Sequence, residues 1–294
     1  MPCFRRVSLC AVLVLASFAA AFGPSRLAAS AVTTPYCGAA LYKADGTVWH
    51  CSFDDEFAGT RLDTTKWIPI PTSLTGLSYA NACFTYSANN INVSNGSLHL
   101  IARKESQPLT CKSPSGNFTT SYTAGQVATT GHFSQTYGLF AVRARFPAAT
   151  VAGLQSSLWM WPQKLSTTKL RGEIDIAEEY SAYADRVIPY IHYDYDKTTS
   201  NLATNTNVVT RNCLLSTVSA FHTYAAQWTT STITIYIDGA VCLQDNLKPS
   251  GTSPFDQPFF INLTQALGVG NNAFAAKTTP LPATTDIDWV RVWK

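Results

Sequence analysis

Alternation of apolar and polar residues along several short runs is the feature that most constrains the fold of this chain. Four runs place apolar side chains at nearly every second position: residues 97–104, 139–146, 232–238 and 286–293. A period of two is the signature of a strand with one buried face. Turn sequences such as Asn95-Gly96 and Asp238-Gly239 lie between the runs. With no amphipathic helix of ordinary length in the sequence, the pattern predicts an all-β chain built as a sandwich or barrel.

Charge and composition exclude two classes of protein. Of the 294 residues, 46% are hydrophobic, which is too large a share for a disordered chain. The formal net charge is +3, and three arginines without any acidic residue lie in residues 1–31. The rest of the chain therefore holds 18 basic and 18 acidic residues, from totals of 21 and 18. A neutral body lacks the basic stripe that binds phosphates, so we expect no nucleic-acid partner.

Residues 1–31 are typical of a secretory signal. Two arginines precede an apolar run over residues 7–22, and small residues at 29–31 suit a cleavage site. The alternative is an uncleaved membrane anchor, but the run is shorter than the ~20 residues of a membrane span. We therefore expect a single domain over residues 32–294 that is secreted, extracellular and free of the membrane after cleavage. Nothing in the sequence indicates a coiled coil or repeated interface, so we expect a monomer.

Six cysteines remain after removal of the signal. An even number in a secreted chain indicates three disulfides, although six cysteines allow 15 connectivities. Proximity in the sequence favours the pairs Cys37–Cys51, Cys83–Cys111 and Cys213–Cys242. The competing interpretation is a zinc site, but the chain has no C-x-x-C spacing.

The residues that carry chemistry gather in the segment GEIDIAE at 172–178. On a strand, Glu173 and Asp175 share one face and the two isoleucines share the other. Strict alternation would place Glu178 on the isoleucine face. One extra residue near Ala177, a β-bulge, would return Glu178 to the carboxylate face, and such bulges are common beside active sites. We therefore predict a row of three carboxyl groups.

A row of this kind suits the hydrolysis of a glycosidic bond. In a retaining enzyme one carboxyl group attacks the anomeric carbon and a second, about 5–5.5 Å away, protonates the leaving oxygen. Asp175 between them would raise the pKa values of its neighbours and help keep the acid protonated. Trp159 and Trp161 precede the segment and Tyr180 follows it, and such rings can stack on sugars. The alternatives are a solvated acidic edge strand and tryptophans that only pack in the core.

The segment at 172–178 resembles the E-x-D-x-x-E signature of glycoside hydrolase family 16, in the form found in its laminarinase-type branch. Further blocks resemble family segments in the same order: FDDEF at 53–57, YGLFAVRAR at 137–145, LWMWP at 158–162, FHTYAAQWT at 221–229 with IDG at 237–239, and DWVRVW at 288–293. The resemblance implies a jelly-roll β-sandwich of the concanavalin-like kind, with a concave glycan-binding cleft.

The resemblance also implies roles for individual residues. Glu173 would be the nucleophile and Glu178 the acid/base, with Asp175 assisting between them. The residues implied in substrate binding are Trp159, His192, Trp161, Trp228, Asn81 and Gln265. No cofactor is implied for catalysis. Many members of the family hold a structural calcium, and the positions that match its ligands are Glu56, Gly96 through its carbonyl, and Asp288. Oxygen ligands of this kind suit calcium.

Some residues depart from the family pattern. Ala82 and Gln227 stand where many relatives have Glu, and residues 264–266 read TQA where many have NLA. These changes fall around the expected cleft and leave the preferred sugar and linkage open. The sequence thus predicts a retaining endo-β-glycan hydrolase, with an endo-β-1,3-glucanase acting on laminarin-like glucan as the first choice. Mixed-linkage glucan and galactans remain possible substrates. A transglycosylase on the same scaffold and a non-catalytic, lectin-like sandwich remain alternative functions.

Overall fold

The computed structural model describes residues 35–165, 171–193, 208–247 and 254–294. Residues Pro35–Lys294 form one compact unit. The expected signal at 1–31 lies outside the described residues. Across the described ranges, every helix falls short of the length and apolar character that crossing a membrane requires.

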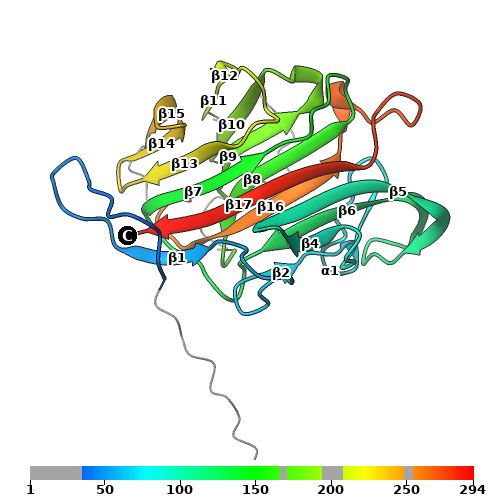
Figure 1. Ribbon diagram of the computed structural model, residues 1–294, viewed down its shortest axis with the longest axis horizontal. Helices are drawn as coiled ribbons and strands as arrows, with labels where there is room; N and C mark the ends of the chain where they lie inside the picture. The colour runs from blue at the N-terminus through cyan, green and yellow to red at the C-terminus, as the bar shows by residue number, and fades with distance from the viewer. Residues whose placement is uncertain (1–34, 166–170, 194–207, 248–253) are drawn as a thin grey trace, which may run out of the picture. The chain divides into compact units, whose positions relative to one another are not determined.

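The described chain is almost entirely β-structure, as the alternation predicts (Figure 1). The strands are β1 Cys51–Asp55, β2 Ile68–Pro69, β3 Cys83–Phe84, β4 Ile91–Ser94, β5 Ser97–Cys111, β6 Phe118–Ala128, β7 Gly138–Arg145, β8 Leu154–Pro162, β9 Glu173–Tyr180, β10 Arg186–His192, β11 Val208–Val209, β12 Cys213–Leu214, β13 His222–Trp228, β14 Thr232–Ile237, β15 Ala240–Asn246, β16 Phe259–Leu267 and β17 Ala283–Trp293. The helical elements in the described ranges are the short α1 Thr72–Thr75, η1 Ser181–Tyr183 and η2 Gly270–Asn272. The four alternating runs lie in β5, β7, β14 and β17.

The strands form two stacked layers, antiparallel throughout apart from the parallel pair β3–β6 (Figure 1). In the first, here called the carboxylate sheet, the order is β11, β10, β9, β8, β16, β6 and β2. In the second, the back sheet, the order is β15, β14, β13, β7 and β17, with β1 and the pair β5–β4 along the far side of β17. The long β5 leaves the back sheet and pairs with β6 in its second half. This layered arrangement is the expected β-sandwich.

The core lies between the two sheets and follows from the period-two pattern. Leu98, Phe140 and Ile235 of the back sheet and Leu158 and Ile174 of the carboxylate sheet are fully buried and belong to one apolar cluster. Burial of each such side chain stabilises the fold by roughly 1.5–3 kcal/mol. Because successive residues point to opposite faces, the residues between these on β8 and β9 must face outward from the carboxylate sheet.

Three disulfides tie segments of the chain to the sandwich. They join Cys37 to Cys51, Cys83 to Cys111 and Cys213 to Cys242, with Cα–Cα distances of 5.6, 5.7 and 5.5 Å. These distances lie within the usual range for disulfides. The pairing predicted from proximity is confirmed, and the zinc alternative is excluded for these cysteines.

Candidate active site

A β-bulge in β9 brings the carboxyl groups to one face. Asp175 lies opposite Trp159 of β8, and Glu178 lies opposite Ser157, so three steps along β9 match two along β8. Ile176 is left without a partner on β8, and the pairing of β9 with β10 shifts at the same place. The extra residue turns Glu178 to the face of Asp175. The predicted bulge near Ala177 is therefore confirmed, and with it the carboxylate row.

Glu178 is held by three hydrogen bonds from the carboxylate sheet. Gln155 Nε2 and Ser157 Oγ donate to Oε1 at 3.0 and 3.1 Å, and the Tyr180 hydroxyl donates to Oε2 at 2.5 Å. Burial, followed by the charge of Asp175, raises the pKa of Glu178 to about 7, although the three hydrogen bonds act in the opposite direction. A carboxyl group with this pKa can both give and accept a proton near neutral pH.

Glu173, Asp175 and His192 form the other end of the row. Burial, then the charge of Asp175 and a hydrogen bond with its side chain, raise the pKa of Glu173 well above its ordinary value. His192 Nε2 lies 3.1 Å from Asp175 Oδ2. One ligand atom from each of the three residues lies within 4.8 Å of the others, which would admit a cation. The contacts among the three side chains explain why they lie together, and no cation is needed to hold them.

Aromatic side chains line the same face. Trp159 is partly exposed and its Nε1 donates to Thr264 Oγ1 at 3.0 Å, while Trp161 packs edge-on against it at 6.2 Å between ring centroids. The His192 ring stacks on Tyr190, with 5.3 Å between centroids and 7° between planes. The structure thus places Trp159, Trp161 and His192 beside the carboxylate row, as expected.

Tyr79, from the loop before β3, lies within the electrostatic reach of the row. Burial raises its pKa to about 12, and the charges of Glu173, Glu178 and Asp175 add to the effect. The sequence interpretation did not find Tyr79, because nothing in the irregular segment around it shows which face of the sandwich the loop covers. The same interpretation also missed Gln155 and Ser157, whose alternation with core residues on β8 is the signal that could have identified them.

Two residues expected to contact sugar point away from this face. Gln265 is fully buried and its Oε1 accepts hydrogen bonds from Ser156 at 3.0 Å and from Thr285 of the back sheet at 2.7 Å. Trp228 lies on β13 of the back sheet, where it is buried against Phe259. The expectation for both is corrected, because each occupies the inward-facing position of its strand.

Asn81 is exposed in the loop that follows Tyr79. Its backbone is left-handed, with φ of 62°, and its Nδ2 donates to the carbonyl of Thr119 at 3.4 Å. This contact joins the loop to β6 rather than to the carboxylate row. A sugar contact by Asn81 stays a prediction.

The three positions expected to bind calcium lie along the back sheet. Both carboxylates have cationic partners: Glu56 forms a two-pronged ion pair with Arg291 at 2.7 and 2.9 Å, and Asp288 pairs with Arg143. Gly96 lies in the β4–β5 turn, with φ of 73°. The side chains as they lie do not fit a calcium ion, because each acid is neutralised by a guanidinium group. Calcium binding stays a prediction that would require both ion pairs to open.

Glu179 is a buried acid that the sequence interpretation also missed. It follows Glu178 and therefore points into the sandwich, where its side chain is fully buried. Among the described residues, neither carboxyl oxygen of Glu179 has a hydrogen-bond partner of ordinary geometry. Ser156 lies beside the carboxyl group. Burial raises its pKa to about 8, so the group is mostly neutral at pH 7.

Comparison with known proteins connects this site to one family. The family model described as "Beta-porphyranase A-D, GH16 domain" matches residues 48–294. The chain is 27% identical over 263 residues to the glucan endo-1,3-beta-glucosidase A1 of Niallia circulans, which covers 82% of this chain and 37% of that protein. It is 29% identical over 179 residues to the keratan-sulfate endo-1,4-beta-galactosidase of Sphingobacterium multivorum, covering 59% of this chain and 40% of that protein. The chain thus spans well under half the length of these two curated relatives.

A solved structure agrees with both the fold and the family. The laminarinase from Rhodothermus marinus superposes with a TM-score of 0.69 at 27% sequence identity, over 84% of this chain and 97% of that one. The jelly-roll sandwich expected from the resemblance is therefore confirmed. With a family model that matches most of its length and a carboxylate row on a bulged strand, the chain belongs to glycoside hydrolase family 16, whose members cleave O-glycosyl bonds.

Proposed function

We propose that the chain is a secreted, monomeric, retaining endo-β-1,3-glucanase that cleaves internal bonds of laminarin-like glucan. The observation that carries the proposal is the row of Glu173, Asp175 and Glu178 on one face of β9. Similarity to a glucan endo-1,3-beta-glucosidase and to a laminarinase supports the choice of substrate.

In the first step Glu178 acts as the acid. Its pKa of about 7 keeps a proton available near neutrality. As the bond between the anomeric carbon and the glycosidic oxygen breaks, the proton of Glu178 passes to the leaving oxygen. The hydrogen bonds from Gln155, Ser157 and Tyr180 fix the carboxyl group in place for this transfer.

Glu173 attacks the anomeric carbon from the opposite side, and a covalent glycosyl ester forms. This role requires an ionised carboxylate, whereas burial and Asp175 favour the protonated form of Glu173. The ionised form of Glu173 is the one that attacks. The hydrogen bond between the Glu173 and Asp175 side chains occupies one oxygen of Glu173 and leaves the other free to attack. His192 beside Asp175 orients that side chain.

The second step reverses the proton transfer. Glu178, now ionised, accepts a proton from a water molecule whose oxygen attacks the anomeric carbon. The ester bond to Glu173 breaks, and the released sugar keeps the original anomeric configuration. If a second sugar hydroxyl takes the place of water, the same site performs transglycosylation, and the products are longer than the substrate.

Two central strands of the carboxylate sheet, β8 and β16, present neutral side chains on its outward face. Its described positions on β8 are Gln155, Ser157, Trp159 and Trp161, and on β16 they are Phe260, Asn262, Thr264 and Ala266. These eight positions include no lysine or arginine. A sulfate ester held in a cleft calls for cationic partners of this kind. These two strands therefore suit a neutral glucan better than a sulfated galactan.

A galactan hydrolase is the second candidate. The description of the matching family model and the similarity to a keratan-sulfate endo-galactosidase favour it. The two candidates place the same carboxyl groups in the same roles and differ only in the sugar that the cleft accepts.

Release of reducing ends from a panel of glycans tests the proposal. The panel holds laminarin, mixed-linkage β-glucan, porphyran and keratan sulfate, each with the mature wild type, Glu173→Gln and Glu178→Gln. Release from laminarin that is lost in both variants supports the glucanase. Release from porphyran or keratan sulfate alone supports the galactan hydrolase. Equal glycan binding by all three proteins without cleavage would leave a lectin. Terminal sequencing of protein from the culture medium and sedimentation test secretion and the monomer.

A further inference from the structure

A hollow lies beside the loop that carries Tyr79. It has a volume of about 370 Å³, within the range of small-molecule sites. Its walls come from the loop residues Ala80 and Asn81, from Thr119, Ser121 and Tyr122 of β6, and from Phe274 after η2. Hydroxyl and amide groups beside aromatic rings are the side chains that bind a sugar, since the polar groups match its hydroxyls and the rings match its apolar face. None of the residues that line this hollow is charged.

One wall of the hollow, Tyr122 of β6, stands on the outward face of the carboxylate sheet. Glu178, Ser157, Thr264 and Gln126 lie opposite one another in one row across β9, β8, β16 and β6. Tyr122 is four residues before Gln126 on β6, so its side chain stands on the same face as Gln126. Strand spacing of ~4.8 Å and a rise of ~3.3 Å per residue place Tyr122 about 20 Å from Glu178 along the sheet. That distance corresponds to several sugar residues of one chain.

The loop before β3 connects the two places. The charges of the three carboxyl groups act on Tyr79, and the next two residues, Ala80 and Asn81, line the hollow. Ala80 and Asn81 both have left-handed backbones, with φ of 46° and 62°. Such a conformation is uncommon for alanine and concentrates at functional sites. A glycan that leaves the carboxylate row past Tyr79 would therefore meet the hollow directly.

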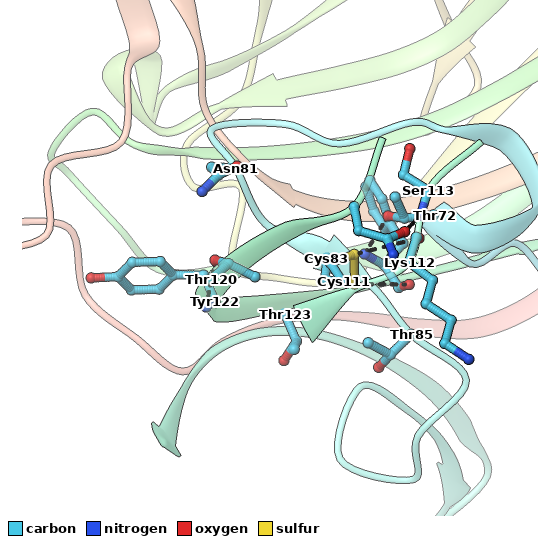
Figure 2. Close-up of a disulfide and its surroundings, with 12 residues drawn as sticks. Thr72, Asn81, Cys83, Thr85, Cys111, Lys112, Ser113, Thr120, Tyr122 and Thr123 are labelled. Carbon is cyan, nitrogen blue, oxygen red and sulfur yellow. Dashed lines mark hydrogen bonds between the residues drawn. A yellow bond between two sulfur atoms is a disulfide. The ribbon is translucent and has the colours of Figure 1, made fainter. Parts of the chain in front are cut away.

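The walls of the hollow are held in place before any ligand binds. The disulfide Cys83–Cys111 joins the strand just after Asn81 to the end of β5, beside the β5–β6 hairpin. Figure 2 shows this disulfide with Asn81, Thr120 and Tyr122 to its left and the ring of Tyr122 directed away from it. Tyr122 packs edge-on against Phe274 at 4.8 Å between centroids. Preorganised walls lower the entropic cost of binding.

We propose that this hollow is a distal sugar-binding subsite, formed by Tyr122, Phe274 and Asn81, that holds a β-glucan chain several residues from the point of cleavage. The proposal rests on the proposed glucanase function, since the same chain must also cross the carboxylate row. It makes the enzyme prefer long chains, because only a long chain reaches both places at once.

Binding of β-1,3-gluco-oligosaccharides of two lengths tests the subsite. The background is Glu173→Gln, which binds without cleaving, and calorimetry measures laminaritriose and laminariheptaose. Tyr122→Ala and Phe274→Ala are each expected to weaken binding of the heptaose by about tenfold and to leave the triose unchanged. Tyr122→Phe, which keeps the ring, should retain most of the affinity. Tyr86→Ala, at an exposed tyrosine outside the hollow, is the matched control.

The outcomes separate the subsite from the function. Heptaose affinity that is unchanged in both alanine variants, with melting temperatures equal to that of the parent, overturns the subsite even if the wild type releases sugar from laminarin. Equal losses for triose and heptaose would indicate a structural role and also overturn it. Failure of the wild type to cleave laminarin, together with failure of the parent variant to bind either oligosaccharide, would overturn the proposed function and the subsite together.

Discussion

The hydroxyl of Tyr180 donates a hydrogen bond of 2.5 Å to Oε2 of Glu178. The two residues lie two positions apart on β9 and share its outward face. Burial and the neighbouring carboxylate raise the pKa of Tyr180, so its hydroxyl remains a donor at every pH at which the enzyme would act. This bond stabilises the ionised form of Glu178 and limits how far burial raises its pKa.

Tyr180→Phe is therefore expected to shift the alkaline limb of the pH profile of kcat/KM to higher pH. Activity requires protonated Glu178 and falls as the pH rises through its pKa of about 7. Removal of the hydrogen bond raises that pKa, so activity should persist to higher pH, by about one unit. Initial rates from pH 4 to 10 measure the shift, with Tyr183→Phe as the control. If the alkaline limb stays at the same pH or moves to lower pH, the assignment of Glu178 as the acid is contradicted.

Asp175→Asn should move the alkaline limb of the pH profile of kcat/KM to lower pH. The charge of Asp175 raises the pKa values of both Glu173 and Glu178. An amide of the same shape removes the charge, so Glu178 loses its proton at lower pH and the alkaline limb moves downward. The maximal rate should also fall, because the amide alters the hydrogen bond that orients Glu173. The same pH series checks both effects, and a limb at the wild-type position would count against the electrostatic role of Asp175.

Trp159→Ala and Trp228→Ala should separate binding from stability. Trp159 lies on the outward face, so its loss is expected to raise KM about tenfold with little change in the free energy of unfolding. Trp228 packs among core rings, so its loss should cost roughly 3–5 kcal/mol of that free energy. Urea unfolding and steady-state kinetics measure the two quantities. A raised KM in folded Trp228→Ala, with no loss of stability, would show that the residue does contact sugar.

Glu179→Gln should remove a pH dependence of stability. The folded-state pKa of Glu179 is about 8, raised by burial from 4.5. Because the folded state binds this proton more tightly, the free energy of unfolding falls as the pH rises from about 4.5 to 8. The amide variant should match the wild type near pH 4 and exceed it at pH 9 by up to about 5 kcal/mol. Urea unfolding at both pH values tests this.

The exposed Asp185→Asn serves as the comparison for that series. Its carboxylate pairs with Arg186 at the surface, so its loss should not change the difference between pH 4 and pH 9. If Glu179→Gln and the wild type lose stability in parallel between the two pH values, the buried carboxyl group does not titrate as described.

The carboxylate row could be predicted from the sequence, because the alternation of apolar residues and the spacing of the acids both place the acids on one face of the strand. The isoleucines at 174 and 176 must face the core, so the three acids could share the outer face only through a bulge, and the structure contains that bulge. Proximity likewise predicted all three disulfides, since each closes a short loop.

The sequence placed Gln265 and Trp228 wrongly. Alternation shows that a strand has two faces, but it does not show which face is buried or which sheet the strand joins. Gln265 alternates with Thr264, and only the pairing with Ser156 shows that Gln265 faces the core. Trp228 resembles an aromatic binding residue, but its strand belongs to the back sheet. Tyr79 could not be predicted at all, because its position depends on how an irregular loop folds over a distant strand.

The anomeric configuration of the first product tests the central claim most directly. Proton NMR can follow cleavage of laminarin by the wild-type enzyme during the first minutes, before the product equilibrates. A double displacement by Glu173 and Glu178 predicts that the β-anomer appears first and that either Gln variant abolishes its appearance. The α-anomer appearing first would show inversion and would contradict the assignment of Glu173 as the nucleophile.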